Sequence, residues 1–431
     1  MRHAQDGAKA VELASQPIGR VLESGSVTFQ QMNERLLIAL LTAIQFTHMV
    51  DFVLMMPLGP QLQRDLPCSP TMFTTLVASY TLSAGMAAAV AGLFIDRFDR
   101  KRVLLCLYLG LTAATAACGL CHTYSTLMLA RIAAGACGGM LGSLVMTIIG
   151  EQIPYERRGA ATGAIMAAFS LASLIGIPCG TYLARHGGWE VPFLALAGVG
   201  ALILVACCLI MRPMREHLAA PRRNAWATIH AVLSVPEHWR AYALTITLTF
   251  SGFTIIPLFA TFMALNVGVG EDHLGWLYGI GGAATVITGP LIGKLADRWG
   301  KHRTFITITL LSLIPVIGVT HLPPLPLIAG IACGTVFMVL MSGRFIPAMA
   351  IITQSAEPHI RGGFQAYNTV FQSLTSGVAA LTTGLLVGKA ADGSLTGFGT
   401  AGWVAMVATL IAAWVGWRLR PVIAATPSLS A

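Results

Sequence analysis

Five ionisable side chains lie within, or at the edge of, long apolar stretches of this 431-residue sequence: His48, Asp51, Arg131, Glu151 and Arg344. A charged group at the centre of a bilayer costs roughly 2.5 to 3.5 kcal/mol on insertion scales. Each therefore needs a partner or a water-filled cavity. Residues of this kind are candidates for a substrate or proton path.

Gln45, His48 and Asp51 are spaced by three, which places them on one broad face of a helix. A carboxylate in apolar surroundings can take up and release a proton near working pH, and imidazole titrates close to neutrality. We predict that Asp51 couples transport to protons, that His48 relays them and that Gln45 lines the substrate cavity. Two alternatives remain: Asp51 sits solvated at the outer mouth, and His48 only bonds a neighbour.

Two arginines are predicted to face the same cavity. Arg131 offers a rigid fork of donors for a carboxylate or a backbone carbonyl. Arg344 stands between Gly343 and Pro347, which loosen a helix, and either binds an anionic substrate group or balances Asp51. For both arginines a purely structural clamp is the alternative.

A polar stripe runs through the apolar stretch at 363–388. Gln365, Asn368 and Gln372 are spaced so that they fall on one side of a helix. Such a stripe either lines a cavity or holds helices together. We predict that it lines the cavity.

The composition indicates that most of the chain lies in lipid and not in water. It is 55% hydrophobic and 10% charged, with a mean hydropathy of +0.72, whereas soluble proteins carry about 25% charged residues. A soluble enzyme is therefore excluded. The chain is expected to cross a membrane many times.

The apolar stretches divide the chain into two groups of six. Since a membrane helix takes about 20 residues, we predict an all-α membrane protein with twelve transmembrane helices in two pseudo-symmetric six-helix bundles. The predicted parts are an N-terminal tail (1–34), a first bundle (35–211), a linker (212–240), a second bundle (241–418) and a C-terminal tail (419–431).

The positions of the charges predict the topology. Most of the 27 Lys and Arg fall in the N-terminal tail, the even-numbered loops or the C-terminal tail, and only Arg64, Arg185 and Lys389 fall in the opposite loops. The positive-inside rule then places both termini in the cytoplasm. No basic stretch interleaved with aromatics suggests nucleic-acid binding, although the net charge is +9.

A loop motif occurs once in each half and reveals an internal repeat. Its members are Gly92, Asp96, Arg97, Arg100 and Lys101 in the first copy, and Gly293, Asp297, Arg298, Lys301 and Arg303 in the second. Parallel six-helix repeats are one way in which transporters are built. We predict that these charged residues gate conformational change.

The repeated loop resembles the signature of the major facilitator superfamily, although Asp99 stands where that loop usually has Gly. The stretch from Leu127 through Arg131 to Gly139 resembles the helix 4 motif of its proton-driven drug and sugar exporters. Gly176, Pro178 and Gly180 resemble their helix 5 motif. The resemblance implies alternating access, export in exchange for protons, contact of Arg131 with helix 1, and a hinge at the helix 5 motif.

Two further patterns are set aside. Cys118 and Cys121 with His122 spell a haem-attachment pattern, but in an apolar run without a soluble pocket. Gly279 to Ala284 resembles a dinucleotide loop without the strand that should precede it. We expect no cofactor and no metal.

These observations predict a monomeric secondary transporter of the bacterial inner membrane. It would export a small organic solute of the drug, sugar or nucleoside type in exchange for protons. One alternative is an importer or facilitator of an organic anion that uses Arg131 and Arg344. A membrane-embedded lipid-modifying enzyme is the alternative of another class, but it would need a second reactive group beside Asp51.

Overall fold

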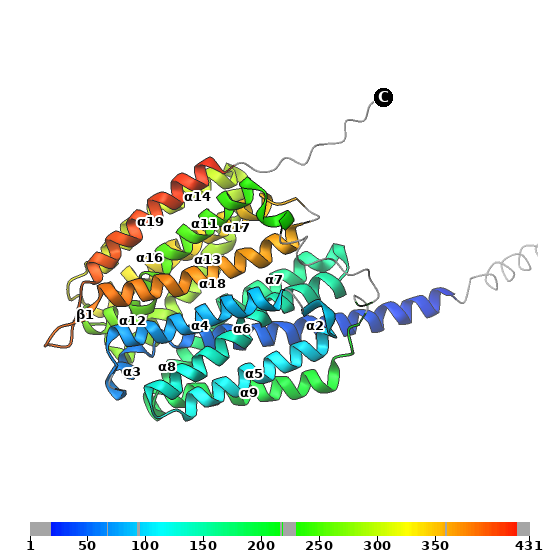
Figure 1. Ribbon diagram of the computed structural model, residues 1–431, viewed down its shortest axis with the longest axis horizontal. Coiled ribbons are helices and arrows are strands. Elements are labelled where there is room, and N and C mark those ends of the chain that lie inside the picture. Colours follow the sequence, from blue (N-terminus) through cyan, green and yellow to red (C-terminus); the bar gives the residue numbers. More distant parts are fainter. Residues whose placement is uncertain are drawn as a thin grey trace, which may run out of the picture.

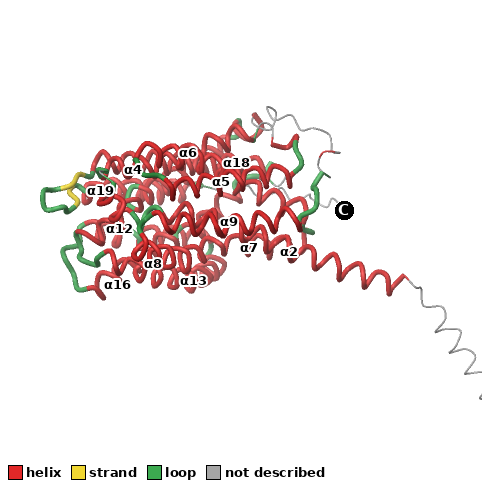
Figure 2. Tube along the Cα trace, turned by 90° about the horizontal axis from the view of Figure 1, so that it is seen from below, coloured by secondary structure: helices red, strands yellow, loops and turns green. Residues whose placement is uncertain are grey.

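A computed structural model describes residues 19–66, 68–92, 95–215, 218, 230–357 and 360–419, with side chains from residue 34 onward except those of residues 96, 155 and 169. Most of the predicted tails (1–18 and 420–431) and part of the predicted linker (216–217 and 219–229) lie outside these residues. Long helices run side by side, and both described chain ends lie at one end of the bundle (Figure 1, Figure 2). We call this the terminal end. The opposite, hairpin end carries a two-stranded hairpin of β1 (Gly388–Lys389) and β2 (Leu395–Thr396).

The first half of the chain builds six spans and two short helices, α3 and η1. Its elements are α2 (Gly19–Leu54), α3 (Gly59–Asp65), α4 (Pro70–Ala91), η1 (Ile95–Arg97), α5 (Arg100–Leu120), α6 (Tyr124–Gln152), α7 (Tyr155–Leu171), η2 (Ala172–Gly176), α8 (Ile177–Gly187) and α9 (Glu190–Ile210).

The second half repeats this arrangement with more interruptions. Its helices are α11 (Pro236–Phe253), α12 (Ile256–Leu265), η4 (Glu271–His273), α13 (Leu274–Trp299), α14 (Lys301–Leu311), α15 (Leu313–Thr320), α16 (Leu327–Gly343), α17 (Phe345–Gln354), α18 (Arg361–Leu386) and α19 (Phe398–Arg418).

Among the described residues, eleven helices are long and apolar enough to cross a membrane. The twelfth predicted span is α18, which has 26 residues but carries Gln365, Asn368 and Gln372. Its polar stripe explains why it falls outside that set. It lies along α4 in Figure 1 and packs extensively against it. The predicted fold of two six-helix halves is confirmed.

Proline accounts for several interruptions, because it has no amide hydrogen to give to the preceding turn. Pro257 follows the break between α11 and α12, and Pro347 follows the break between α16 and α17. In the fifth span Pro178 follows a π-helical turn, η2, in which the Ile177 amide bonds the Ala172 carbonyl. Hydroxyl and carboxylate caps start other spans, as Ser69 does for α4 and Thr123 for α6.

Three hydrophobic cores hold the helices together. At the hairpin end one shared core contains residues of both halves, among them Leu62, Phe73, Phe193, Phe259 and Phe398. At the terminal end the first half has its own core around Tyr108 and Leu144. The second half has another around Tyr242 and Phe364. The two halves therefore share a core at the hairpin end and have separate cores at the terminal end.

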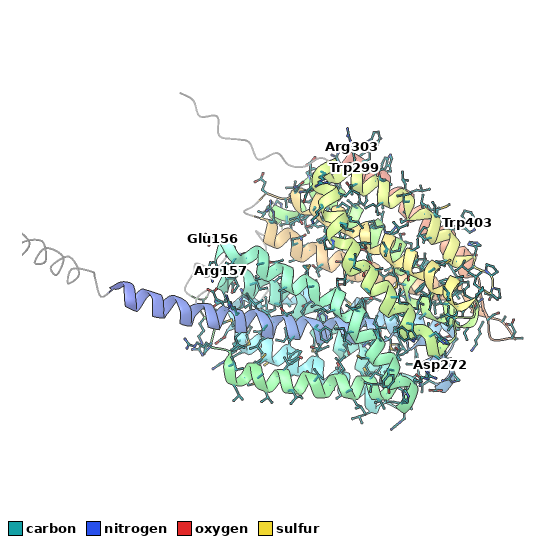
Figure 3. All side chains as sticks on the ribbon, turned by 180° about the vertical axis from the view of Figure 1, so that it is seen from behind. Glu156, Arg157, Asp272, Trp299, Arg303 and Trp403 are labelled. Atoms are coloured by element: carbon teal, nitrogen blue, oxygen red, sulfur yellow. The ribbon has the colours of Figure 1, made fainter. Side chains whose placement is uncertain are left out.

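Exposed aromatic side chains mark both ends of the bundle. Trp239, Trp299 and Trp417 are exposed at the terminal end, and Tyr182, Trp276 and Trp403 at the hairpin end. Figure 3 shows Trp299 and Trp403 far apart along the helices. Trp and Tyr favour membrane–water interfaces, so the two groups bracket the membrane-spanning part.

Candidate substrate and proton site

The first half holds a buried ion pair close to the end of α2 on the hairpin side. Asp51 on α2 and Arg131 on α6 are each 1% exposed, and an Arg131 Nη1 donates to Asp51 Oδ2 at 3.3 Å and to the Asp51 backbone carbonyl at 3.3 Å. The Thr115 hydroxyl donates to Asp51 Oδ1 at 2.8 Å. Residues of three helices thus meet at one carboxylate. Although α2 ends at Leu54, Asp51 is buried, so the alternative of a solvated carboxylate at the outer mouth does not hold for this state.

Tyr80 completes this cluster, and the sequence contains no pattern that singles it out. The Arg131 guanidinium carbon lies 4.3 Å from the centre of the Tyr80 ring, within the range of a cation–π contact. The other face of the ring stacks on Phe52 at 5.3 Å, and Phe52 stacks in turn on Phe253 of the second half at 6.1 Å. An aromatic row therefore connects the ion pair to the boundary between the halves.

His48 and Gln45 lie one and two turns from Asp51 on the same face of α2 and are buried. They pack against α6 where Gly138 leaves room: a Cβ there would lie 2.8 Å from His48 Nε2 and 2.7 Å from the Tyr80 hydroxyl. Within the described part of the chain, Gln45 Oε1, His48 Nδ1 and the Tyr80 hydroxyl lack hydrogen-bond partners. Buried polar atoms are normally bonded, so these three groups have unused capacity for a hydrogen bond inside the first half.

Arg344 lies in the interior of the second half and is fully buried. Its guanidinium donates to Ser312 at 3.4 Å, Thr409 at 3.1 Å and Ser251 at 3.2 Å. Among the described residues, no carboxylate lies within ion-pairing distance of it, so it does not pair with Asp51. Its predicted role at the substrate remains a prediction.

Helix ends offer a physical reason why this charge is tolerated. The helices α11, α14 and α16 all end at the depth of Arg344, at Phe253, Leu311 and Gly343. The C-terminal end of a helix carries partial negative charge, which stabilises a nearby cation, but the N-termini of α12, α15 and α17 follow within three residues and offset part of this effect. The breaks in three spans of the second half therefore lie beside Arg344, and the helix ends that they create surround its charge.

The polar stripe of α18 contacts its own half. Asn368 Oδ1 accepts from Thr245 on α11 at 2.5 Å, and Gln365 Nε2 donates to Thr353 on α17 at 3.5 Å. Gln372 is half-buried, and its backbone carbonyl accepts from Ser376. The prediction that these residues line a substrate cavity stays a prediction.

The first copy of the loop motif is bonded to its surroundings. Arg100 makes a two-pronged ion pair with Glu151 at the end of α6, at 3.0 and 2.7 Å. Lys101 Nζ donates to the carbonyls of Cys208 and Met211, which close α9. Arg97 is exposed and Gly92 follows α4 directly. The side chain of Asp96 lies outside the described residues.

The second copy of the loop motif makes fewer hydrogen bonds and ion pairs with neighbouring described helices than the first copy. His302 Nδ1 lies 3.1 Å from the Gly416 carbonyl at the end of α19, which matches the contact of Lys101 with the end of α9. Asp297, Arg298 and Arg303 are exposed, and in the described ranges they have no ion-pair or hydrogen-bond partner. Lys301 is half-exposed, and Gly293 has open space around it. A gating role for either copy remains a prediction.

Asp99 replaces the glycine of the motif for a structural reason. Gly300, its counterpart in the second half, has φ +91°, which favours glycine, whereas Asp99 has φ −56° and caps α5 by accepting from the Lys101 amide. It also accepts from the Met214 amide at 3.1 Å and from Arg215 at 3.0 Å. The aspartate thus fixes the start of the linker to the first half.

Replacing Asp99 by Asn is expected to lower the free energy of unfolding at pH 7 by up to about 1 kcal/mol, because the exposed partner Arg215 limits the gain. Burial alone would raise the pKa of Asp99, but hydrogen bonds from Arg215, Met214 and Lys101 outweigh it and lower that pKa. This stabilisation is therefore present above the unfolded pKa of about 3.9 and is lost as the pH falls through the lower folded pKa.

Thermal unfolding of both proteins in detergent at pH 7 and pH 3 measures this effect. The difference between wild type and Asp99→Asn should shrink at pH 3. A difference of equal size at both pH values would show that the charge of Asp99 contributes nothing.

The predicted hinge coincides with the π-helical turn of the fifth span. A Cβ on Gly176 would lie 2.4 Å from Val50, and one on Gly180 would lie 2.2 Å from Leu54, so both glycines let this span pack closely on α2. Pro178 faces Gly275 and Gly279 of α13, across the boundary between the halves. Bending at this position during transport remains a prediction.

Ion pairs connect the two halves at the hairpin end. Arg64 binds Glu271 at 2.8 Å, and Arg185 binds Asp272 at 3.0 Å. The four side chains border a cavity of about 320 Å³ together with Thr181 and other residues. All four are at least one-third exposed, so each pair contributes little stability, but both oppose separation of the halves at this end.

The sequence pattern of the Major Facilitator Superfamily matches residues 41–259 and 241–431, which together span nearly the whole chain. The chain belongs to the Major Facilitator Superfamily. It is therefore a multi-pass membrane transporter and not an enzyme, and the alternative of a lipid-modifying enzyme is wrong. Members of this family bind small-molecule substrates and generally function as monomers.

Similar proteins agree with this assignment. The uncharacterized MFS-type transporter YceJ of Bacillus subtilis is 24% identical over 361 residues, which are 83% of this chain and 90% of YceJ. The crystal structure of a D-xylose-proton symporter matches with a TM-score of 0.75 and 17% identity, covering 90% of this chain and 98% of that one. A bacterial homologue of the human lysosomal transporter Spinster, inward-facing and unoccupied, matches with a TM-score of 0.72 and 15% identity over 90% and 97%. At these identities the structures establish the fold alone.

Proposed function

We propose that this transporter exchanges a small organic solute for protons and exports the solute across the bacterial inner membrane. Asp51 is the proton-coupling group, and Arg131 holds it in place. Both termini lie in the cytoplasm, so the terminal end of the bundle is the cytoplasmic side.

The buried Asp51–Arg131 pair is the observation that carries this proposal. Asp51 and Asp99 are the buried carboxylates of the described chain, and Asp99 lies in a loop. Asp51 is therefore the buried acid of the described chain that lies within a membrane-spanning helix, where it can take up a proton. Binding a proton would remove the charge that Arg131 pairs with, which changes the energy of the contacts between α2 and α6. That is the kind of differential contact that a conformational switch needs.

The row of unsatisfied groups beside Asp51 supports a path for the proton. His48 and Gln45 continue from Asp51 towards the terminal end along α2, and the Tyr80 hydroxyl lies over the same glycine as His48. An imidazole and a phenol both accept and donate protons. We therefore assign the relay to His48, with Tyr80 as an additional member.

The three cores support alternating access. Because the halves share a core only at the hairpin end, separation at the terminal end disturbs no common core. The state described here is then closed at the hairpin end. Opening that end requires the ion pairs of Arg64 and Arg185 to break, with Gly176, Pro178 and Gly180 as the hinge.

A second candidate is an importer or facilitator of an organic anion. Its support is Arg344, a buried cation without a carboxylate partner among the described residues. Against it, Arg131 already has a carboxylate partner, and the hydroxyls around Arg344 belong to the second half alone. The substrate class of the exporter is a small solute of the drug, sugar or nucleoside type, and the similar symporter carries D-xylose.

Proteoliposomes with a trapped pH indicator test the proposal. Sugars, nucleosides and cationic drugs are added one at a time, and lumenal pH is followed for wild type and Asp51→Asn. We expect one compound to drive proton movement in the wild type, and we expect Asp51→Asn to reduce this flux at least tenfold. Asp392→Asn, a change of an exposed carboxylate in the hairpin loop, is the control and should leave the flux unchanged.

Three other outcomes decide against parts of the proposal. Full proton flux in Asp51→Asn moves the coupling site elsewhere. Transport of labelled solute without proton movement means that the protein is a facilitator. Uptake of an organic anion that depends on Arg344 and not on Asp51 establishes the second candidate.

A further inference from the structure

A hollow at the terminal end of the second half lies apart from the buried Asp51–Arg131 pair and includes two arginines of the second loop motif. Arg298, Trp299, Arg303, Ile306 and Thr307 border it, and its volume is about 560 Å³. Figure 3 shows Trp299 and Arg303 at the corner of the second half that lies far from Glu156 and Arg157 of the first half. The hollow therefore opens on the outer surface of the bundle, at the level of the exposed aromatic residues.

Positive charge dominates the polar part of this hollow. Arg298 lies in the last turn of α13 and Arg303 lies in the first turn of α14, so the two guanidinium groups flank one short connection. Lys294 and Lys301 add two further positive charges, and Asp297 is the carboxylate in this stretch. The contact of His302 with Gly416 ties the connection to α19. The two arginines are thus presented by a fixed loop.

An apolar surface continues from the hollow towards the middle of the membrane. Arg303, Thr307, Leu310 and Ile314 follow one another at helical spacing along α14 and α15, and all four are exposed. Trp299, 60% exposed, stands at the upper edge beside the arginines. Cationic and aromatic groups above an aliphatic stripe match the shape and chemistry of a phospholipid.

We propose that this hollow, defined by Arg298, Trp299, Arg303, Ile306 and Thr307, binds the headgroup of an anionic phospholipid. The two arginines hold its phosphate by charge-assisted hydrogen bonds. Trp299 packs against the glycerol region, and the acyl chains lie along Thr307, Leu310 and Ile314.

A lipid fits better than a free phosphate ion. Arg298 and Arg303 are exposed, and a small ion held by exposed arginines is screened and solvated. A phospholipid is already held at the right depth by its acyl chains, and anionic lipids attract basic residues near the membrane surface. The aliphatic stripe below the arginines would make no favourable contact with a free phosphate ion.

Native mass spectrometry of the full-length protein in detergent tests the proposal. Phosphatidylglycerol or phosphatidylcholine is titrated onto wild type, onto Arg298→Gln/Arg303→Gln, and onto the control Arg102→Gln/Arg212→Gln. The control removes two exposed positive charges from the terminal end of the first half. We expect the wild type to prefer phosphatidylglycerol and the first variant to bind it about tenfold more weakly, while the control keeps wild-type affinity.

The position of the bound lipid is measured by the quenching of tryptophan fluorescence with brominated phosphatidylglycerol. The quenching at low lipid ratios should be reduced in Trp299→Phe, which keeps an aromatic ring of similar position. Arg298→Lys/Arg303→Lys keeps the charges and should retain most of the binding, which separates loss of the site from misfolding.

Several results would overturn the proposal. Equal binding of both lipids, equal loss in the control variant, or quenching that does not involve Trp299 each exclude a specific site here. If inorganic phosphate at millimolar concentration displaces phosphatidylglycerol completely, the hollow is a site for the free ion and the lipid assignment is wrong.

Discussion

Replacing Arg131 by Gln is expected to lower the free energy of unfolding by about 3 to 5 kcal/mol, because it leaves the buried Asp51 carboxylate without its cation. The same change also removes the contact with the Tyr80 ring. Thermal unfolding in detergent, followed by the loss of monodisperse protein, measures the effect as a fall of several degrees in the midpoint.

The double variant Asp51→Asn/Arg131→Gln is expected to recover most of that stability, because no unpaired charge remains. Arg344→Gln is a matched comparison, since its partners are the neutral hydroxyls of Ser251, Ser312 and Thr409. Neutral partners left behind cost less than a charge, about 1 to 3 kcal/mol. If Arg131→Gln and the double variant unfold at the same temperature, the ion pair does not stabilise this state.

Replacing Gly135 by Ala is expected to destabilise the first half by up to about 3 kcal/mol, the upper end of the range for overpacking. A Cβ at this position would lie 2.2 Å from the Tyr80 backbone carbonyl oxygen and 2.3 Å from the Ser83 hydroxyl. The backbone of α4 cannot rotate away as a side chain can, so α4 and α6 must move apart. That movement would also displace Tyr80 from Arg131.

Gly150→Ala is the matched control on the same helix. A Cβ there meets nothing within 4 Å, so the substitution should be neutral or slightly stabilising, by about 0.5 to 1 kcal/mol. Midpoints of thermal unfolding for the two variants give the comparison. Equal midpoints would show that α4 and α6 separate easily and that their close approach is not needed for stability.

The membrane-spanning helices were predictable because their signals are local. Hydropathy over about 20 residues marks a span, and the recurrence of Asp96 and Asp297 in matching loops marks the two halves. The structure shifts most boundaries by only a few residues, but α2 begins at Gly19, well inside the predicted N-terminal tail. For example, the predicted span at 191–211 corresponds to α9, Glu190–Ile210.

The interior of the site was only partly predictable. Spacing identified the polar face of α2 with Gln45, His48 and Asp51, because a repeat of three is a property of one helix. The same reasoning missed Tyr80 and Thr115, since a tyrosine or threonine in an apolar run carries no pattern. Their importance comes from contacts between distant parts of the sequence: Thr115 donates to Asp51, 64 positions away, and the Tyr80 ring lies against Arg131, 51 positions away.

The sequence by itself determined that this protein lies in a membrane, that it has two halves of six helices, and which of its residues are unusual in a membrane. Only the tertiary structure decided which of those residues meet. It pairs Asp51 with Arg131, leaves Arg344 among hydroxyls and helix ends, and tethers one copy of the repeated loop more than the other. The physical reason is that spacing fixes positions around one helix axis, whereas the rotation of each helix against its neighbours depends on the packing of all of them.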